Sequence, residues 1–318
     1  MAHLVEQMAY VGQTPWHGLG NQLTANQPLE VWADQAGMNW DIEEAPVRFM
    51  TGKSGYLGEI LTYPDSKVLY RSDTKAPLSV VGNRYKVVQP REILEFYRDL
   101  TEKSGFELET AGVLKGGKKF WALAKTGQST ALKGNDVTNG YVLLASSADS
   151  TMATTAQFCS VRVVCNNTLQ IALGNNKGAV KIPHSTVFDA DAVKKELGIE
   201  VSQWQEFMYR LKLLSDRKVN ARGAKGYFER VYTEHTRDGL RTNEKAMAQA
   251  LSLFDGRGRG SNLPSAHNTA FGLLNAVTEF VDHERRARNT DYRLDSAWFG
   301  QGANLKQKAL DEALLLAA

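Results

Sequence analysis

Residues 106–125 read FELETAGVLKGGKKFWALAK and decide the fold, because they contain a complete β-hairpin. Residues 106–114 alternate in part between apolar and polar side chains, and residues 119–125 form a second β-rich run. The tetrapeptide Lys115-Gly116-Gly117-Lys118 stands between them, and a Gly-Gly pair supplies the positive φ angles of a tight hairpin turn. The stretch therefore predicts two neighbouring antiparallel strands.

Elements on both sides extend this hairpin into an α+β fold. Residues 90–100 have helical spacing, and strands are expected at 141–145 and 153–164. Residues 165–173 begin with asparagines that can cap a helix, so we expect a helix to start there. The order helix, hairpin, strands, helix favours a central antiparallel sheet with packed helices. Further short strands are expected at residues 47–50, 60–63, 68–71 and 78–81.

The pattern after residue 185 is mainly helical. Apolar residues recur every three or four positions through 189–214, and 244–254 and 269–281 are further candidate helices. The sequence therefore predicts a helical C-terminal third. The expected division is an N-terminal arm with a short helix at 1–50, an α+β core at 51–185 and a mainly helical region at 186–318.

The composition is that of an ordinary globular protein. The 318 residues are 42% hydrophobic and 23% charged, and the net charge of +3 is far below that of a histone-like protein. Residues 1–12 lack the basic and apolar parts of a signal peptide, and no apolar run is long enough for a membrane helix. We expect a cytoplasmic protein without membrane contact.

Motifs of known catalytic or cofactor chemistry do not occur. None of the six histidines belongs to an HExxH motif or a paired Cys/His spacing. The sequence also lacks a GxSxG nucleophile motif and a complete phosphate-binding loop. The chain is therefore expected to have no catalytic residues, no metal and no cofactor, and not to be an enzyme.

Positive charge is concentrated in residues 210–260, which hold twelve Lys or Arg and six Asp or Glu. Such an excess suits a polyanion, although a solvated helical surface gives the same pattern. Basic and aromatic residues interleave, as in proteins that bind single strands, but the aromatic residues could equally be core. Arg162, on a Val-rich strand, is either a paired core ion or a groove contact. The predicted nucleic-acid-binding residues are Lys118, Lys119, Trp121, Arg162, Arg217, Lys218, Arg222, Lys225, Arg257 and Arg259.

Several stretches together resemble the phage/plasmid-like protein family, a domain of unknown function. They are Thr14–Gly20, Ala156–Phe158 with Arg162–Thr168, and Asn275–His283 with Leu294–Gly300. The resemblance covers nearly the whole chain and implies a mobile-element protein, with no catalytic residues to transfer. The order of elements is also similar to the core of phage single-strand annealing proteins, which implies a ring or filament that pairs single strands. A likeness of fold does not establish function.

Three hypotheses remain open at this stage. The first is a homo-oligomer that binds and anneals single-stranded DNA in homologous recombination. The second is a metal-dependent nuclease with a dispersed site, for which Asp216, Glu229, Asp255 and Asp282 are the nearby acids. The third is a host-interaction or counter-defence protein that acts through surfaces such as Trp298-Phe299-Gly300. Salt-sensitive DNA binding, magnesium-dependent loss of substrate and a nuclease-resistant host partner would separate them.

Overall fold

A computed structural model describes residues 7–12, 20–52, 58–98, 100–101, 106–162, 164, 167–170, 179–197, 201–237, 239–288 and 290–317. The chain forms two compact units whose sequences interleave. Unit 1 consists of Met1–Lys125, Val142–Gln157 and Ala179–Leu197. Unit 2 consists of Thr126–Tyr141, Phe158–Gly178 and Gly198–Ala318.

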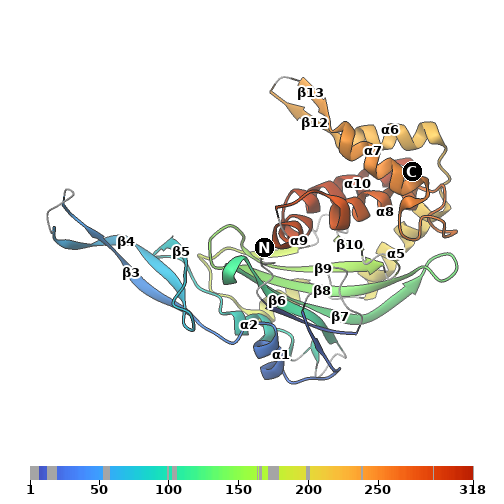
Figure 1. Cartoon of the computed structure of the whole chain (residues 1–318). Coiled ribbons are helices and arrows are strands. Elements are labelled where there is room, and N and C mark those ends of the chain that lie inside the picture. The colour runs from blue at the N-terminus through green and yellow to red at the C-terminus, as the bar shows by residue number, and fades with distance from the viewer. Residues whose placement is uncertain are drawn as a thin grey trace. The chain divides into compact units, whose positions relative to one another are not determined.

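Among the described residues, eight strands form the main sheet, and Figure 1 shows several of them side by side. Its order is β10-β9-β8-β7-β6-β1-β2, and β11 pairs with β9 as well. The β6–β7, β1–β6, β9–β10 and β9–β11 pairs are antiparallel, whereas β1–β2 is parallel. Strands β7, β8 and β9 contribute residues to both units. The strands are β1 (Gln7–Val11), β2 (Asn21–Leu23), β6 (Glu107–Leu114), β7 (Lys119–Ala131), β8 (Val137–Ser147), β9 (Thr154–Arg162), β10 (Asn167–Gln170) and β11 (Ala179–Ile182).

The predicted hairpin is confirmed as the β6–β7 pair. Its turn has φ angles of 74° at Gly116 and 89° at Gly117, which is the conformation that favours glycine. A Cβ on Gly117 would lie 2.8 Å from the ring of Trp40, so this turn also needs a residue without a side chain for packing.

Helices of unit 1 are short and follow the capping signals of the sequence. Helix α2 (Pro90–Glu95) starts at a proline, and Gln89, which precedes the helix, forms a capping box with Glu92 in its first turn. Just beyond α2, the buried Tyr97 hydroxyl lies 2.9 Å from the carbonyl oxygen of Ala122. Two further helices with described bounds in this unit are α1 (Leu29–Gln35) and α4 (Ala190–Leu197).

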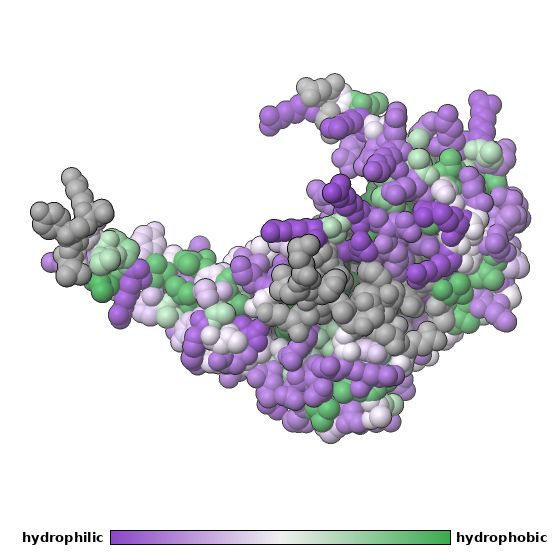
Figure 2. Space-filling view, viewed as in Figure 1, coloured by the Kyte–Doolittle hydropathy of each residue, from purple (hydrophilic) through white to green (hydrophobic). Residues whose placement is uncertain are grey.

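A separate three-stranded sheet in unit 1 has the order β3-β4-β5, and we call it the arm. It comprises β3 (Ile42–Met50), β4 (Ile60–Arg71) and β5 (Pro77–Gly82). Strand β5 pairs only with residues 66–70 of β4, so the far end of the arm is a two-stranded ribbon (Figure 1). Hydrophobic residues are visible along the surface of the arm (Figure 2).

Unit 2 is mainly helical. Helix α8 is buried along its whole length, and it starts at Thr269, whose side chain accepts a hydrogen bond from the Gly272 N–H. The aromatic rings of Tyr227 and Phe228 are also buried, with centroids 5.3 Å apart. The elements are α5 (Val201–Asp216), α6 (Ala221–Tyr232), β12 (Thr233–Thr236), β13 (Gly239–Thr242), α7 (Glu244–Ser252), a π-helical turn (Leu253–Arg257), α8 (Ala270–Glu279), a second π-helical turn (Phe280–Glu284), α9 (Thr290–Phe299) and α10 (Gln301–Ala317).

The α+β class and the helical C-terminal part are thus confirmed, but some elements differ from the prediction. Residues 167–170, expected at a helix start, form strand β10 because they pair with the edge of β9. The predicted strands at 60–63 and 68–71 are one strand, β4. Residues 14–19 lie outside the described part of the chain, and the division near residues 50 and 185 stays a prediction. Within the described residues, no helix has both the length and the apolar character needed to cross a bilayer.

Candidate functional site

A group of exposed cations lies where α5 ends and α6 begins. Arg217 and Lys218 occupy the connection, and Arg222 and Lys225 lie in the first turns of α6. All four side chains are exposed, and Lys225 Nζ is 3.9 Å from a carboxylate oxygen of Glu229. We call the four cations the α5–α6 corner.

The main chain of the corner is fixed by the loop that precedes α8. The Ala270 N–H donates to the Arg217 carbonyl oxygen at 2.9 Å, and the Val219 N–H donates to the Asn268 carbonyl oxygen at 2.9 Å. These bonds hold the connection against the protein, and the side chains of Arg217 and Lys218 are exposed, with Lys218 Nζ also donating to the His267 carbonyl oxygen at 3.2 Å. The corner is therefore a fixed feature of unit 2.

Helix α6 adds its own positive end to these cations. The Asn220 side chain caps the helix by accepting the Gly223 N–H at 2.9 Å. The aligned peptide dipoles place a partial positive charge at a helix N-terminus, where anions are stabilised. The helix end and the side-chain charges of the corner thus have the same sign.

Nearby negative charge does not neutralise the corner. Asp216, the last residue of α5, has its Oδ1 atom 2.6 Å from Lys133 Nζ. Among the residues that the structure describes, no ion pair involves Arg217, Lys218 or Arg222. Three of the four cations therefore lack a carboxylate partner within the described chain.

Helix α5 leads to the corner with an exposed aromatic side chain. Tyr209 is 59% exposed and Leu213 is 40% exposed. Tyr209 and Leu213 are four residues apart and lie along one side of α5, and Arg217, four residues further on, directly follows the helix, where its N–H donates to the Leu213 carbonyl oxygen at 3.1 Å. At 1.5 Å per residue, Tyr209 and Arg217 are about 12 Å apart along the axis. The exposed ring of Tyr209 thus lies on the side of α5 that leads to the exposed guanidinium of Arg217.

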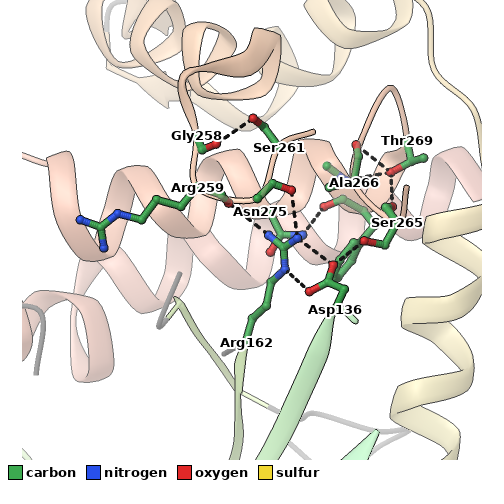
Figure 3. A network of polar contacts seen from close by, with 12 residues as sticks. Asp136, Arg162, Gly258, Arg259, Ser261, Ser265, Ala266, Thr269 and Asn275 are labelled. Atoms are coloured by element: carbon green, nitrogen blue, oxygen red, sulfur yellow. Dashed lines mark hydrogen bonds and ion pairs between the residues drawn. The ribbon is translucent and has the colours of Figure 1, made fainter. Parts of the chain in front are cut away.

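A second pair of cations lies on the loop Leu253–Gly260, which we call the Gly loop. A Cβ on Gly258 would lie 2.6 Å from the carbonyl oxygen of Leu253, so only glycine fits at position 258. Arg257 Nη2 is 3.4 Å from Glu284 Oε2, whereas the exposed Arg259 side chain points away from the polar network beneath it (Figure 3). Gly258 therefore allows the backbone of the Gly loop to fold back closely onto Leu253.

Arg162 holds the Gly loop from the protein interior (Figure 3). Its Nε and Nη2 atoms donate to the two carboxylate oxygens of Asp136, each at 2.7 Å. The same Nη2 donates to the Gly260 carbonyl oxygen at 3.2 Å, and Nη1 donates to the Arg259 carbonyl oxygen at 3.5 Å. The Ser265 hydroxyl also donates to Asp136. One guanidinium thus connects strand β9, the residue that precedes β8 and the Gly loop.

The Arg162–Asp136 pair is withdrawn from solvent, with side chains only 4% and 0% exposed. A bidentate pair of this kind satisfies both charges at once, which is the condition for burying them. Arg162 is therefore a paired core ion, one of the two alternatives that the sequence left open. Its role in unit 2 is to position the loop that carries Arg257 and Arg259.

The side chain of Glu279 also binds the backbone of the Gly loop. Its carboxylate oxygens accept the Arg259 N–H at 3.0 and 3.1 Å. Burial raises the pKa of the Glu279 carboxyl above its ordinary value of 4.5, although the Arg259 N–H and the nearby arginine charges oppose this. An acid with a raised pKa in the folded state makes folding less favourable once it ionises.

E279Q should therefore gain stability relative to the wild type as the pH rises. Well below pH 4.5 the carboxyl is protonated in both the folded and the unfolded chain, so no ionisation cost applies. Towards neutral pH the wild type bears the cost of a buried negative charge and the glutamine does not. Urea unfolding of both proteins across this range measures the difference in free energy of unfolding. A difference that stays constant with pH would contradict the assignment.

The ten predicted contact residues have different surroundings. Arg217, Lys218, Arg222 and Lys225 form the exposed corner, and Arg257 and Arg259 are exposed on the Gly loop. Lys118 is half-buried in the hairpin of unit 1. The groove position expected for Lys119, Trp121 and Arg162 does not fit their burial, since they are 5%, 2% and 4% exposed. Strand β7 places Lys119 and Trp121 in the core. Arg162 is buried in its ion pair with Asp136.

Sequence reasoning missed the residues that support the site. Asp136, Ser265 and Glu279 are isolated polar residues in the sequence, without a motif or a spacing that would reveal them. The β12–β13 hairpin was also missed, and it carries the exposed Arg237 and Arg241. A hairpin could have been suspected from the Thr-rich segments on either side of Gly239.

The acids considered for a nuclease do not form a metal centre in the described part of the chain. There, no group of three or more His, Cys, Asp or Glu side chains is placed to hold an ion. Asp282 is buried and its Oδ1 lies 2.9 Å from Lys306 Nζ, while Asp216 pairs with Lys133.

Comparison with known proteins identifies a family. No curated protein and no solved structure matches the chain. The model of a domain of unknown function, DUF932, matches residues 77–298, which is more than two thirds of the sequence. The matched region includes the α5–α6 corner, the Gly loop and the Arg162 network, whereas β3 and β4 of the arm lie before it. The chain therefore belongs to the DUF932 family, whose function is not known.

Proposed function

We propose that the protein binds single-stranded DNA, with the α5–α6 corner in contact with the phosphates. The observation that carries this proposal is the set of three exposed cations without carboxylate partners in the described chain, beside the N-terminus of α6. Phosphates are bound by Arg and Lys side chains and by helix N-termini, and such contacts do not depend on base sequence. The exposed arginines of the Gly loop would extend the contact.

Tyr209 supports a single strand over a duplex. Proteins that bind single strands combine a basic track with aromatic rings on which unpaired bases stack. The Tyr209 ring is exposed on the side of α5 that leads to Arg217, so a base and a phosphate of one strand could be contacted together. A duplex keeps its bases stacked inside and offers no such face.

Annealing of complementary strands is the activity that we propose for this binding. The order of a hairpin, further strands and helices is similar to that of phage annealing proteins, and annealing requires neither a metal nor a nucleotide. A phage or plasmid origin, a role in homologous recombination, assembly into a ring or filament and a location in the cytoplasm are parts of the same proposal. These parts rest on the resemblance and not on the corner.

The proposal is tested by titrating the purified full chain into a fluorescent oligothymidylate and measuring anisotropy at several salt concentrations. Each phosphate contact on a single strand gives a slope of about −0.7 in log K against log salt, so four contacts predict about −3. A duplex of equal length should bind more weakly, and two complementary strands should pair faster with the protein present. Absence of binding at low salt, or a slope near zero, would refute the phosphate contacts.

A further inference from the structure

Helix α8 and the second π-helical turn form one continuous helical segment, Ala270–Glu284, because the backbone keeps helical angles at Glu279 and Phe280. The two parts have ten and five residues, so the segment is about 22 Å long at about 1.5 Å per residue. All residues of α8 are buried, so a ligand beside the segment contacts the residues that pack around it. Several of those residues are cations.

The α5–α6 corner lies at the beginning of this segment. The Ala270 N–H donates to the carbonyl oxygen of Arg217 at 2.9 Å. Lys218 forms an isolated β-bridge with Thr269, the residue that caps α8. Two of the four cations of the corner are therefore held at the first end of the segment.

The Gly loop lies beside the later part of the segment. The Glu279 carboxylate accepts the Arg259 N–H, and Glu284, the last residue of the segment, has its Oε2 atom 3.4 Å from Arg257 Nη2. The exposed Arg259 side chain points away from Thr269, which marks the beginning of α8 (Figure 3). The two arginines of the loop therefore lie between the corner and the far end of the segment.

Two further exposed arginines, Arg286 and Arg288, lie just after the far end of the segment. Among the residues that the structure describes, neither forms an ion pair, whereas Arg285 Nη2 donates to Gln301 Oε1 at 3.0 Å. The Arg288 guanidinium lies over the ring of Tyr292, 5.7 Å from its centroid, and Tyr292 is 40% exposed. We call Arg286, Arg288 and Tyr292 the distal cluster, which combines exposed positive charge with an aromatic ring.

We propose that a single strand lies along this segment, with its phosphates bound by the α5–α6 corner at one end and by the distal cluster at the other. The inference rests on the proposed binding of single-stranded DNA and assigns that site a second end. Arginines bind phosphates without regard to base sequence, and the Gly loop supplies such contacts between the two ends. Tyr209 and Tyr292 give each end an exposed ring on which a base can stack.

The length of the segment sets the length of the bound strand. Phosphates of a stacked strand are about 3.4 Å apart, so about 22 Å corresponds to six or seven nucleotides. Single-strand-binding domains of the OB-fold class cover about 4–16 nucleotides, so this length is an ordinary one. A strand of four nucleotides covers only about 10 Å at the same spacing and would be held at one end alone.

Oligothymidylates of twelve and four nucleotides test the inference by fluorescence anisotropy with the purified full chain. R286E/R288E should bind the longer strand about thirtyfold more weakly than the wild type, at about fivefold for each lost phosphate contact. Its salt slope for that strand should become shallower by about 1.4. It should bind the shorter strand nearly as the wild type does, because the corner still holds that strand.

The matched control R84E/K86E reverses two exposed cations of unit 1 and has the same net charge as R286E/R288E. It should bind both strands nearly as the wild type does. If R286E/R288E binds the longer strand as the control does, or loses the same factor for both strands, the inference is wrong while the corner remains a binding site. A wild type that binds neither strand would overturn the proposed function and the inference together.

Photo-cross-linking tests whether one strand reaches both ends. A twelve-nucleotide strand with 4-thiothymidine at both termini should join peptides that contain Tyr209 and Tyr292 to the same oligonucleotide. The four-nucleotide strand should give no such double product. Cross-links of the longer strand that never include the Tyr292 peptide would overturn the inference. Circular dichroism of R286E/R288E should match that of the wild type, because both substituted positions are exposed.

Discussion

R162A is expected to lower the free energy of unfolding by about 3–5 kcal/mol, because it leaves the buried Asp136 carboxylate without its counter-charge. The substitution removes the two 2.7 Å hydrogen bonds from Arg162 to Asp136. It also removes the contact of the guanidinium with the Phe271 ring, whose centroid is 5.3 Å away. Asp136 would keep only the Ser265 hydroxyl as a side-chain donor among the contacts that the structure describes.

Urea unfolding followed by circular dichroism measures this loss. The paired variant D136L/R162M replaces both charges by apolar groups and should be clearly more stable than R162A, since no unpaired charge remains buried. A cost below about 1 kcal/mol for R162A would mean that Asp136 is not held as a buried ion.

The same substitution should loosen the Gly loop. Arg162 donates to the carbonyl oxygens of Arg259 and Gly260, so R162A should expose the peptide bonds after Arg257 and Arg259 to trypsin under conditions in which the rest of the chain stays folded. D136L/R162M lacks the same loop contacts and should also be cut there. Resistance of the loop in both variants would show that the loop keeps its position without Arg162.

R217E/K218E/R222E is expected to weaken the binding of single-stranded DNA by at least about a hundredfold. A cation beside an anionic surface contributes about 1 kcal/mol, and three such contacts therefore amount to about a factor of one hundred before repulsion is added. The loss should be similar for all base sequences, because phosphate contacts carry no sequence information. The salt slope should become shallower by about 2, at about 0.7 for each lost contact.

A control with equal charge change separates this effect from general electrostatics. R84E/K86E/K181E reverses three exposed cations of unit 1, so both variants have the same net charge. It should bind nearly as the wild type does. Equal weakening by the two variants would show that the overall charge, and not the α5–α6 corner, governs binding. Melting temperatures of both variants should stay near that of the wild type, because all six positions are exposed.

The parts of the fold that could be predicted are those with local signals. The hairpin at 106–125 depends on Gly116 and Gly117, and α2 depends on Pro90, so neighbouring residues decide both. The error at residues 165–173 has a non-local cause. Asparagines at the start of that segment favour a helix cap, but the open edge of β9 is available, and pairing across a sheet overrides a capping preference.

The candidate site likewise has one part that local sequence reveals and another that depends on residues far apart in the chain. The α5–α6 corner could be found from sequence because Arg217, Lys218, Arg222 and Lys225 are close together in the chain. The Arg162 network could not, because Asp136 is 26 residues before Arg162, and Ser265 is 129 residues after Asp136. Charge alone also cannot distinguish a buried lysine from an exposed one, and Lys119, which the sequence predicts as a contact, is buried.

The interleaving of the two units has a consequence for synthesis of the protein. Unit 2 takes Thr126–Tyr141 and Phe158–Gly178 from the middle of the chain and closes its core with α10, where the Ala309 carbonyl oxygen accepts the Tyr227 hydroxyl at 2.8 Å. Those middle segments therefore leave the ribosome long before the helix that completes their unit. A nascent chain cannot complete the core of unit 2 until residues 301–317 have been translated, so truncation before that point removes a helix that packs in the interior of this unit.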